Sequence, residues 1–156
     1  SMTGAVGNSS GEIIMQGNKF CITASNMICW YNGKTQWSYS TMSNEVSIME
    51  PTASELQVVN PFSVISNFQT TLMKGNASSN IVQLKPKNAR TSQFSQVVVT
   101  ISKKNNLPSK IVATMRDKSK ISITLSGYRT GGNFPASTFV YNKKYVPAGT
   151  QVVDLR

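Results

Sequence analysis

The run WYNGKTQWSY at residues 30–39 constrains the fold of this chain most strongly, because it places aromatic segments on both sides of Asn32-Gly33. Asn-Gly between hydrophobic runs is a strong hairpin signal, since both residues tolerate the positive φ of a type I′ turn. A two-residue turn would place Ile28 opposite Trp37. The run therefore predicts an antiparallel hairpin, and with it a chain built mainly from β-strands.

Neighbouring segments extend this hairpin into a sheet with one apolar face. A turn at residues 24–26 would place Phe20 opposite Trp30, and a four-residue loop after the hairpin would add a strand at residues 45–49. Side chains alternate between the faces of a strand, so every second residue shares a face. The apolar wall predicted in this way consists of Phe20, Ile22, Ile28, Trp30, Trp37, Tyr39, Val46 and Ile48.

The same turn at residues 24–26 would bring Cys21 opposite Cys29, the only two cysteines of the chain. A cross-strand disulfide is one interpretation, because closely approaching strand positions allow it. Two small buried apolar side chains are the other. Both interpretations stay open at the level of sequence.

Strand patterns recur along the rest of the chain. Residues 12–16 predict an early strand, and the alternation in residues 120–125 places Ile121, Ile123 and Leu125 on one face. Further strands are expected at residues 81–85, 96–102 and 111–115, with hairpin turns at 105–108 and 116–119 and a loop at 127–134 before a helical turn within 135–141.

One amphipathic helix is expected between Asn60, which could cap it, and Gly75, which could end it. Pro61 suits the first turn of such a helix. Apolar residues at spacings of three and four would form a stripe able to cover the sheet. The stripe consists of Phe62, Ile65, Phe68 and Leu72.

The charge of the chain is strongly positive, with 16 Lys and Arg against 6 Asp and Glu. Such a balance favours polyanions or anionic membrane surfaces as partners. The wall aromatics share their face with Ile and Val instead of Lys, which argues against a stacking platform for nucleic acid. We therefore expect transient contact with a membrane surface and no nucleic-acid binding.

The residue types needed for catalysis are scarce. The chain has no His, and its six carboxylates form no paired motif. Two thiols are too few for structural zinc, and Gly131-Gly132 lacks the Lys-Ser/Thr of a phosphate-binding loop. The sequence predicts no enzyme, no metal site and no cofactor.

The apolar wall could be an ordinary core. A helix of about fourteen residues spans only about 21 Å, however, which is too short to cover a sheet of eight or nine strands. A second helix, a partner or a ligand would have to cover the remainder.

An ordered series of short motifs resembles the outer-membrane lipoprotein carrier proteins, the LolA-like family. After Gly11-Glu12 and Lys19-Phe20, the hairpin at residues 30–39 is similar to the family's Tyr-Asp-Gly-Lys-Thr hairpin. The series continues with Asn44-Glu45-Val46, Glu50-Pro51 and Asn60-Pro61-Phe62, and closes with residues 152–156.

This resemblance implies an α+β chain, mainly β, in which a curved antiparallel sheet forms an open half-barrel with helices over its concave apolar face. It implies a periplasmic carrier of acylated lipoproteins. Its partners would be an inner-membrane lipoprotein-releasing transporter and an outer-membrane acceptor. The acyl chains would contact the eight wall residues and the four residues of the helical stripe.

The chain departs from the family pattern in three places, one of which is the exchange of Asp-Gly for Asn32-Gly33 in the hairpin turn, where both pairs allow the same φ. The family has an N-terminal helix before the first strand, whereas residues 1–10 of this chain are expected to be a flexible segment. The family also has an early arginine that latches the lid, and this chain has Gln16-Gly17-Asn18 near that position. We expect residues 11–156 to form one monomeric lipid-binding domain. A related lipoprotein sensor and a scaffold or adhesion domain with a dry core are the alternatives.

Overall fold

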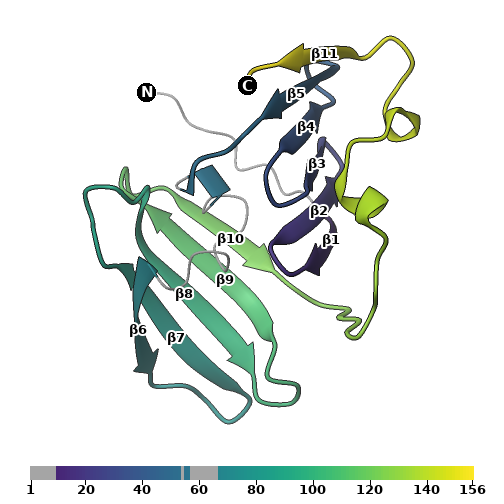
Figure 1. Ribbon diagram of the computed structural model, residues 1–156. Coiled ribbons are helices and arrows are strands. Elements are labelled where there is room, and N and C mark those ends of the chain that lie inside the picture. The colour runs from purple at the N-terminus through teal and green to yellow at the C-terminus, as the bar shows by residue number, and fades with distance from the viewer. Residues whose placement is uncertain (1–9, 54, 57–66) are drawn as a thin grey trace. The chain divides into compact units, whose positions relative to one another are not determined.

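The structure, a computed structural model, describes residues 10–53, 55–56 and 67–156. The chain divides into two compact units, Ser1–Pro51 with Gly132–Arg156 and Thr52–Gly131, each with its own sheet. The strands are β1 (Gly11–Gln16), β2 (Lys19–Ala24), β3 (Met27–Tyr31), β4 (Gln36–Ser40), β5 (Glu45–Met49), β6 (Phe68–Met73), β7 (Ser79–Pro86), β8 (Phe94–Ser102), β9 (Pro108–Met115), β10 (Lys120–Thr124) and β11 (Gln151–Asp154) (Figure 1).

The first unit is a six-stranded sheet in the order β1-β2-β3-β4-β5-β11. Neighbouring strands are antiparallel except β11, which pairs in parallel with β5. Two short 3₁₀ turns, η2 (Ala136–Phe139) and η3 (Lys143–Tyr145), precede β11. The expected strands at residues 12–16, 45–49 and the C-terminus are confirmed, as is the helical turn within 135–141.

The β2–β3 hairpin has a tighter turn than the sequence predicted. Ala24 pairs with Met27, which leaves a two-residue turn in place of three. A shift of one residue moves a whole strand's side chains to the other face. Cys21 therefore lies opposite Trp30, and the prediction that Phe20 and Ile22 share a face with Trp30 is wrong.

The β3–β4 connection is a four-residue loop, not the predicted two-residue turn. Its Asn32 side chain accepts hydrogen bonds from the N–H groups of Lys34 (3.0 Å) and Thr35 (2.8 Å), which stabilises the wider loop. Trp30 now lies opposite Trp37. The register differs from the predicted one by two residues. Because side chains alternate between the faces with a period of two, this shift leaves every side chain on its predicted face, and the predicted sharing of faces between β3 and β4 is correct.

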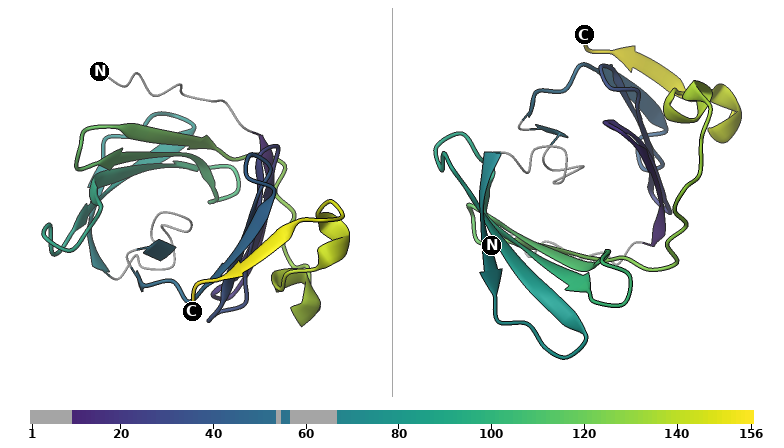
Figure 2. Two further views of the ribbon diagram at one scale, coloured as in Figure 1. Left: turned by 90° about the horizontal axis from the view of Figure 1, so that it is seen from above. Right: turned by 60° about the horizontal axis from the view of Figure 1, so that its bottom comes forward.

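The two faces of the six-stranded sheet therefore differ in composition. The face that we call the Trp30 face carries, by register, Ile28, Trp30, Trp37, Tyr39, Val46 and Ile48. The opposite face, called the Phe20 face, carries Ile13, Met15, Phe20, Ile22, Cys29, Tyr31 and Gln36. Figure 2 shows the segment of η2 and η3 lying along one side of this sheet.

The second unit is a five-stranded antiparallel meander in the order β10-β9-β8-β7-β6. Its strands contain the predicted segments at 81–85, 96–102 and 111–115, and β10 ends one residue before the predicted 125. The turn at 116–119 lies where it was expected, and the other lies at 103–107, because β9 already begins at Pro108. The unit therefore follows the alternation of the sequence closely.

The predicted helix is wrong over its second half, because β6 is a strand. Phe68 lies opposite Pro86 and Met73 opposite Ile81, so β6 pairs with β7 along its length. Asn60, Pro61, Phe62 and Ile65 lie outside the described residues. Gly75 ends no helix; it lies in the β6–β7 turn, where a Cβ atom would be 2.3 Å from the carbonyl oxygen of Ser79.

One face of the five-stranded sheet is apolar and the other is mainly polar. The apolar face, called the Phe68 face, has a buried cluster of Phe68, Leu84, Phe94, Val97, Val99, Ile111 and Ala113. The opposite face, called the Gln83 face, is marked by a hydrogen bond of 2.9 Å from Gln83 Nε2 to Gln96 Oε1. The unit therefore has the composition of a sheet that buries one side.

The prediction of a mainly β chain is confirmed, whereas two further expectations are not. The strands divide between two sheets instead of forming one continuous antiparallel sheet. Within the described ranges, no helix is long enough to cover a sheet face, and none is both long and apolar enough to cross a membrane.

Candidate functional site

The Phe68 face combines a buried centre with exposed apolar edges. At the centre, Leu84 and Val97 are almost completely buried. At the two edge strands, Leu72 on β6 is 73% exposed and Ile121 on β10 is 41% exposed. Large aliphatic side chains in water at the rim of an apolar face mark it as a candidate binding surface.

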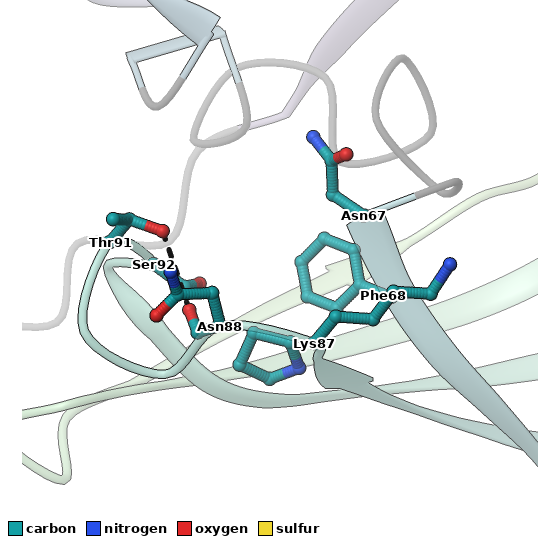
Figure 3. A pocket seen from close by; sticks show the side chains of 7 residues that line it. Asn67, Phe68, Lys87, Asn88, Thr91 and Ser92 are labelled. Carbon is teal, nitrogen blue, oxygen red and sulfur yellow. Dashed lines mark hydrogen bonds between the residues drawn. The ribbon is translucent and has the colours of Figure 1, made fainter.

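A cavity of about 250 Å³ opens beside Phe68, where β6 begins and β7 ends (Figure 3). The Phe68 ring and Pro86 supply its apolar wall. Its remaining lining residues are Asn67, Lys87, Asn88, Thr91 and Ser92. Pockets that enclose a whole small ligand usually measure about 300–1,000 Å³, so this cavity alone is too small for a long acyl chain.

Hydrogen bonds hold the polar rim of this cavity in place. The Lys87 N–H donates to the carbonyl oxygen of Asn67 over 2.9 Å, which fixes the end of β7 against the start of β6. Ser92 Oγ accepts the N–H of Phe94 over 3.2 Å. The rim is therefore preorganised, with apolar and polar walls facing one small space.

The Trp30 face contains six of the predicted ligand-binding residues, and the chain's own C-terminal segment packs on it. Trp30 is 2% exposed and makes an edge-on ring contact of 5.6 Å with Tyr141. Phe139, which is fully buried, joins the same cluster with Tyr39 and Val46. This face has the packing of a core in the first unit.

The Phe20 face holds the other two predicted residues of the wall. Phe20 is buried, with its ring centroid 5.1 Å from that of Tyr31, and Ile22 is half-buried. Ile13 and Met15 on the edge strand β1 are each 45% exposed. Burial raises the pKa of the Tyr31 hydroxyl. The structure thus separates Phe20 and Ile22 from the other six residues of the predicted wall.

The two cysteines lie on opposite faces of the sheet, so the disulfide interpretation is wrong. Both are buried free thiols. Cys29 lies opposite Ile22 and Ser38, and burial raises the pKa of its thiol to about 11 against the opposing effect of a hydrogen bond from the Ser38 hydroxyl. The alternative prediction, two small buried apolar side chains, is confirmed.

The sequence reasoning missed the three residues that cover the Trp30 face, Phe139, Tyr141 and Val146. The available signal was the apolar run Phe139-Val140-Tyr141, which lies within the expected helical turn at residues 135–141. Within the described parts of the chain, no three His, Cys, Asp or Glu side chains gather to hold a metal ion.

Comparisons with known proteins give one family and a shared fold. The family model described as "Outer membrane lipoprotein carrier protein LolA" matches residues 1–119. No curated protein is similar enough to match the chain.

Among solved structures, an uncharacterised conserved protein from Thermus thermophilus is similar at 13% identity and a TM-score of 0.56, covering 94% of this chain and 82% of that one. A putative outer membrane lipoprotein-sorting protein domain from Vibrio parahaemolyticus has 13% identity, a TM-score of 0.47 and coverage of 78% and 63%. A DUF1329 family protein from Desulfovibrio piger has 10% identity, a TM-score of 0.41 and coverage of 71% and 58%.

Proposed function

This chain belongs to the LolA family of outer membrane lipoprotein carrier proteins, and from that membership we propose that it is a periplasmic, non-enzymatic carrier of acylated lipoproteins. The carrier receives cargo from an inner-membrane lipoprotein-releasing transporter and delivers it to an outer-membrane acceptor. Residues 11–156 act as one lipid-binding domain, and the protein works as a monomer.

The partly exposed Phe68 face is the observation that carries this proposal. Transfer of an acyl chain of about sixteen carbons from a membrane into water costs about 0.8 kcal/mol of free energy per methylene, which is on the order of 12 kcal/mol in all. Shelter on that scale needs an apolar surface that extends well beyond a single small cavity. On the Phe68 face the accessible apolar side chains, Leu72 and Ile121, lie at the edges of a buried apolar centre that could extend the contact.

We assign the acyl chain to the Phe68 face, with Phe68 and Leu72 among its contacts. On the six-stranded sheet, the edge of the Phe20 face is the second acyl-binding surface, where Ile13 and Met15 are each 45% exposed beside Phe20 and Ile22. The Trp30 face packs against Phe139 and Tyr141. Ile28, Trp30, Trp37, Tyr39, Val46 and Ile48 then stabilise the fold. Contacts by Phe62 and Ile65 remain a prediction from the sequence.

A titration with a fluorescent acylated peptide tests this assignment. Leu72→Asp places a charge on the Phe68 face at a position that solvent already reaches, so the fold should tolerate it. We expect the affinity for the acylated peptide to fall by at least about tenfold, because a buried aliphatic contact is lost. The same peptide without its acyl chain should not bind.

Met42→Asp is the matched control, because Met42 is 91% exposed in the turn before β5 and the charge change is the same. Its affinity should equal that of the unaltered protein. If Leu72→Asp and Met42→Asp bind the acylated peptide equally well, the Phe68 face does not hold the acyl chain. If the unaltered protein does not bind the peptide at all, a scaffold domain with a dry core is the better description.

A further inference from the structure

Almost all of the net positive charge lies in the second unit. Residues 52–131 contain eleven of the 16 Lys and Arg but only two of the six Asp and Glu, Glu55 and Asp117. The first unit holds five basic and four acidic residues and is close to neutral. All eleven basic side chains of the second unit are exposed.

Three of these side chains lie on the same face of the five-stranded sheet, the Gln83 face, on different strands. Lys85 on β7 is opposite Gln69, Lys110 on β9 lies between Thr100 and Thr124, and Lys120 on β10 is opposite Thr114. The hairpin turns at the two ends of the same sheet add Lys103, Lys104, Arg116 and Lys118. Positive charge therefore extends along this face of the sheet and both of its ends.

These cations have no carboxylate partners among the described residues. Both ion pairs found there, Lys34 with Glu50 and Arg156 with Asp154, belong to the first unit. The Asp117 carboxylate instead accepts the N–H of Ser119 over 2.9 Å. Asp117, in the turn that carries Arg116 and Lys118, offsets only part of this positive charge, so the surface stays strongly positive.

We propose that the Gln83 face is a docking surface for a bilayer that contains anionic phospholipids. Phosphate groups at a bilayer surface supply negative charge over an area that matches lysines spread across several strands. Lysine acts as a compact point charge and needs no fixed bidentate partner, which suits headgroups that move laterally. The surface lies opposite the Phe68 face, so a membrane and an acyl chain need not compete for it.

The composition of this face favours a bilayer over single-stranded nucleic acid. Single-strand binders place aromatic rings where bases can stack. By register, the described strands put Gln83, Gln96, Val98, Thr100 and Val112 on the Gln83 face, and no aromatic residue. Phe68 and Phe94 belong to the buried cluster of the opposite face.

Sedimentation with lipid vesicles tests the proposal on the full chain. The vesicles contain phosphatidylcholine alone or phosphatidylcholine mixed with phosphatidylglycerol. We expect the protein to sediment with the mixed vesicles, to stay in solution with pure phosphatidylcholine, and to be released by salt well above physiological ionic strength, where the Debye length falls below about 8 Å.

A triple variant, Lys85→Gln, Lys110→Gln and Lys120→Gln, tests whether the Gln83 face is responsible. Each lysine at a membrane surface strengthens binding by about fivefold, so this variant should lose on the order of one hundredfold in vesicle affinity. The matched control is Lys19→Gln, Lys143→Gln and Lys144→Gln, which removes the same charge from the first unit. Circular dichroism confirms that both variants fold.

Equal binding to both kinds of vesicle, or equal losses in the two triple variants, would overturn the proposal. So would a single-stranded oligonucleotide that binds the protein more tightly than the mixed vesicles and is released by the Gln83-face variant. Binding of the acylated peptide is measured in parallel, and both triple variants should retain it. Loss of vesicle binding and loss of cargo binding are thereby distinguished.

Discussion

The thiol of Cys29 lies inside the six-stranded sheet, opposite Ile22 on β2 and Ser38 on β4. It has no exposed surface, and the Ser38 hydroxyl donates to its sulfur over 3.6 Å. Burial disfavours the charged thiolate, which explains why its pKa rises to about 11. Cys29 therefore behaves as a small apolar residue at neutral pH.

We predict that both cysteines are free thiols and that burial makes them slow to react in the folded protein. A pKa about two units above the ordinary value leaves about a hundredfold less thiolate on Cys29, so a thiol-specific reagent should modify it slowly in the native protein. Denaturation without reductant should release two reactive thiols. If denaturation releases none, a disulfide joins Cys21 and Cys29 and the β2–β3 register is incorrect.

The pH dependence of stability should follow the same thiol. The folded pKa of Cys29 is raised, so its contribution to stability is complete below the unfolded pKa, near 9, and is lost as the pH rises toward about 11. We expect Cys29→Ala to reduce this alkaline loss in urea unfolding experiments. If the loss is unchanged in the variant, another group causes it.

At the scale of single residues, the sequence predicted which residues are apolar but not the pairing register that each turn imposes on its strands. Asn32-Gly33 correctly marked a connection between β3 and β4. The Asn32 side chain, however, binds two N–H groups and widens the loop, which a dipeptide rule cannot show. The turn before β3 is shorter by one residue, and this single residue separates Phe20 from Trp30.

At the scale of elements, β6 shows why an amphipathic spacing can mislead. Phe68 and Leu72 fit a helical stripe, but they also fit an alternating strand in which Thr70 lies between them. Thr70 and Thr71 are β-branched and favour a strand. Pairing with β7 decides between the two patterns, and that long-range contact is not visible in the local sequence.

The C-terminal segment is the element that completes the first unit. Its Phe139 is fully buried against Trp30, Tyr39 and Val46, and β11 then pairs with β5. The final strand was expected, but its parallel pairing was not. Local patterns do not specify which strand edge a distant segment will join.

We predict that Phe139→Ala destabilises the protein by about 3–5 kcal/mol, because a buried aromatic ring is removed and leaves a cavity. The only two tryptophans of the chain, Trp30 and Trp37, lie on the face that this ring covers, so their fluorescence reports unfolding by urea directly. Phe134→Ala, at a ring that is 39% exposed, is the control and should cost less than about 1 kcal/mol. Equal effects of the two variants would show that Phe139 does not hold the segment in place.

At the scale of the whole molecule, the sequence predicted a mainly β carrier-like chain but not its division into two sheets. The alternating strands and the overall charge of +10 could be seen directly. How that charge is divided depends on where the chain separates into units, which follows from contacts between distant residues. The result is a near-neutral unit and a strongly basic one.

The proposed carrier function requires that the protein bind acyl chains in water. Native mass spectrometry with a synthetic acylated peptide, and with the same peptide lacking its acyl chain, measures this most directly. We predict a stable complex with the acylated peptide alone, and a smaller bound fraction for Leu72→Asp than for Met42→Asp. An uncomplexed mass in the presence of excess acylated peptide would contradict the proposed carrier function.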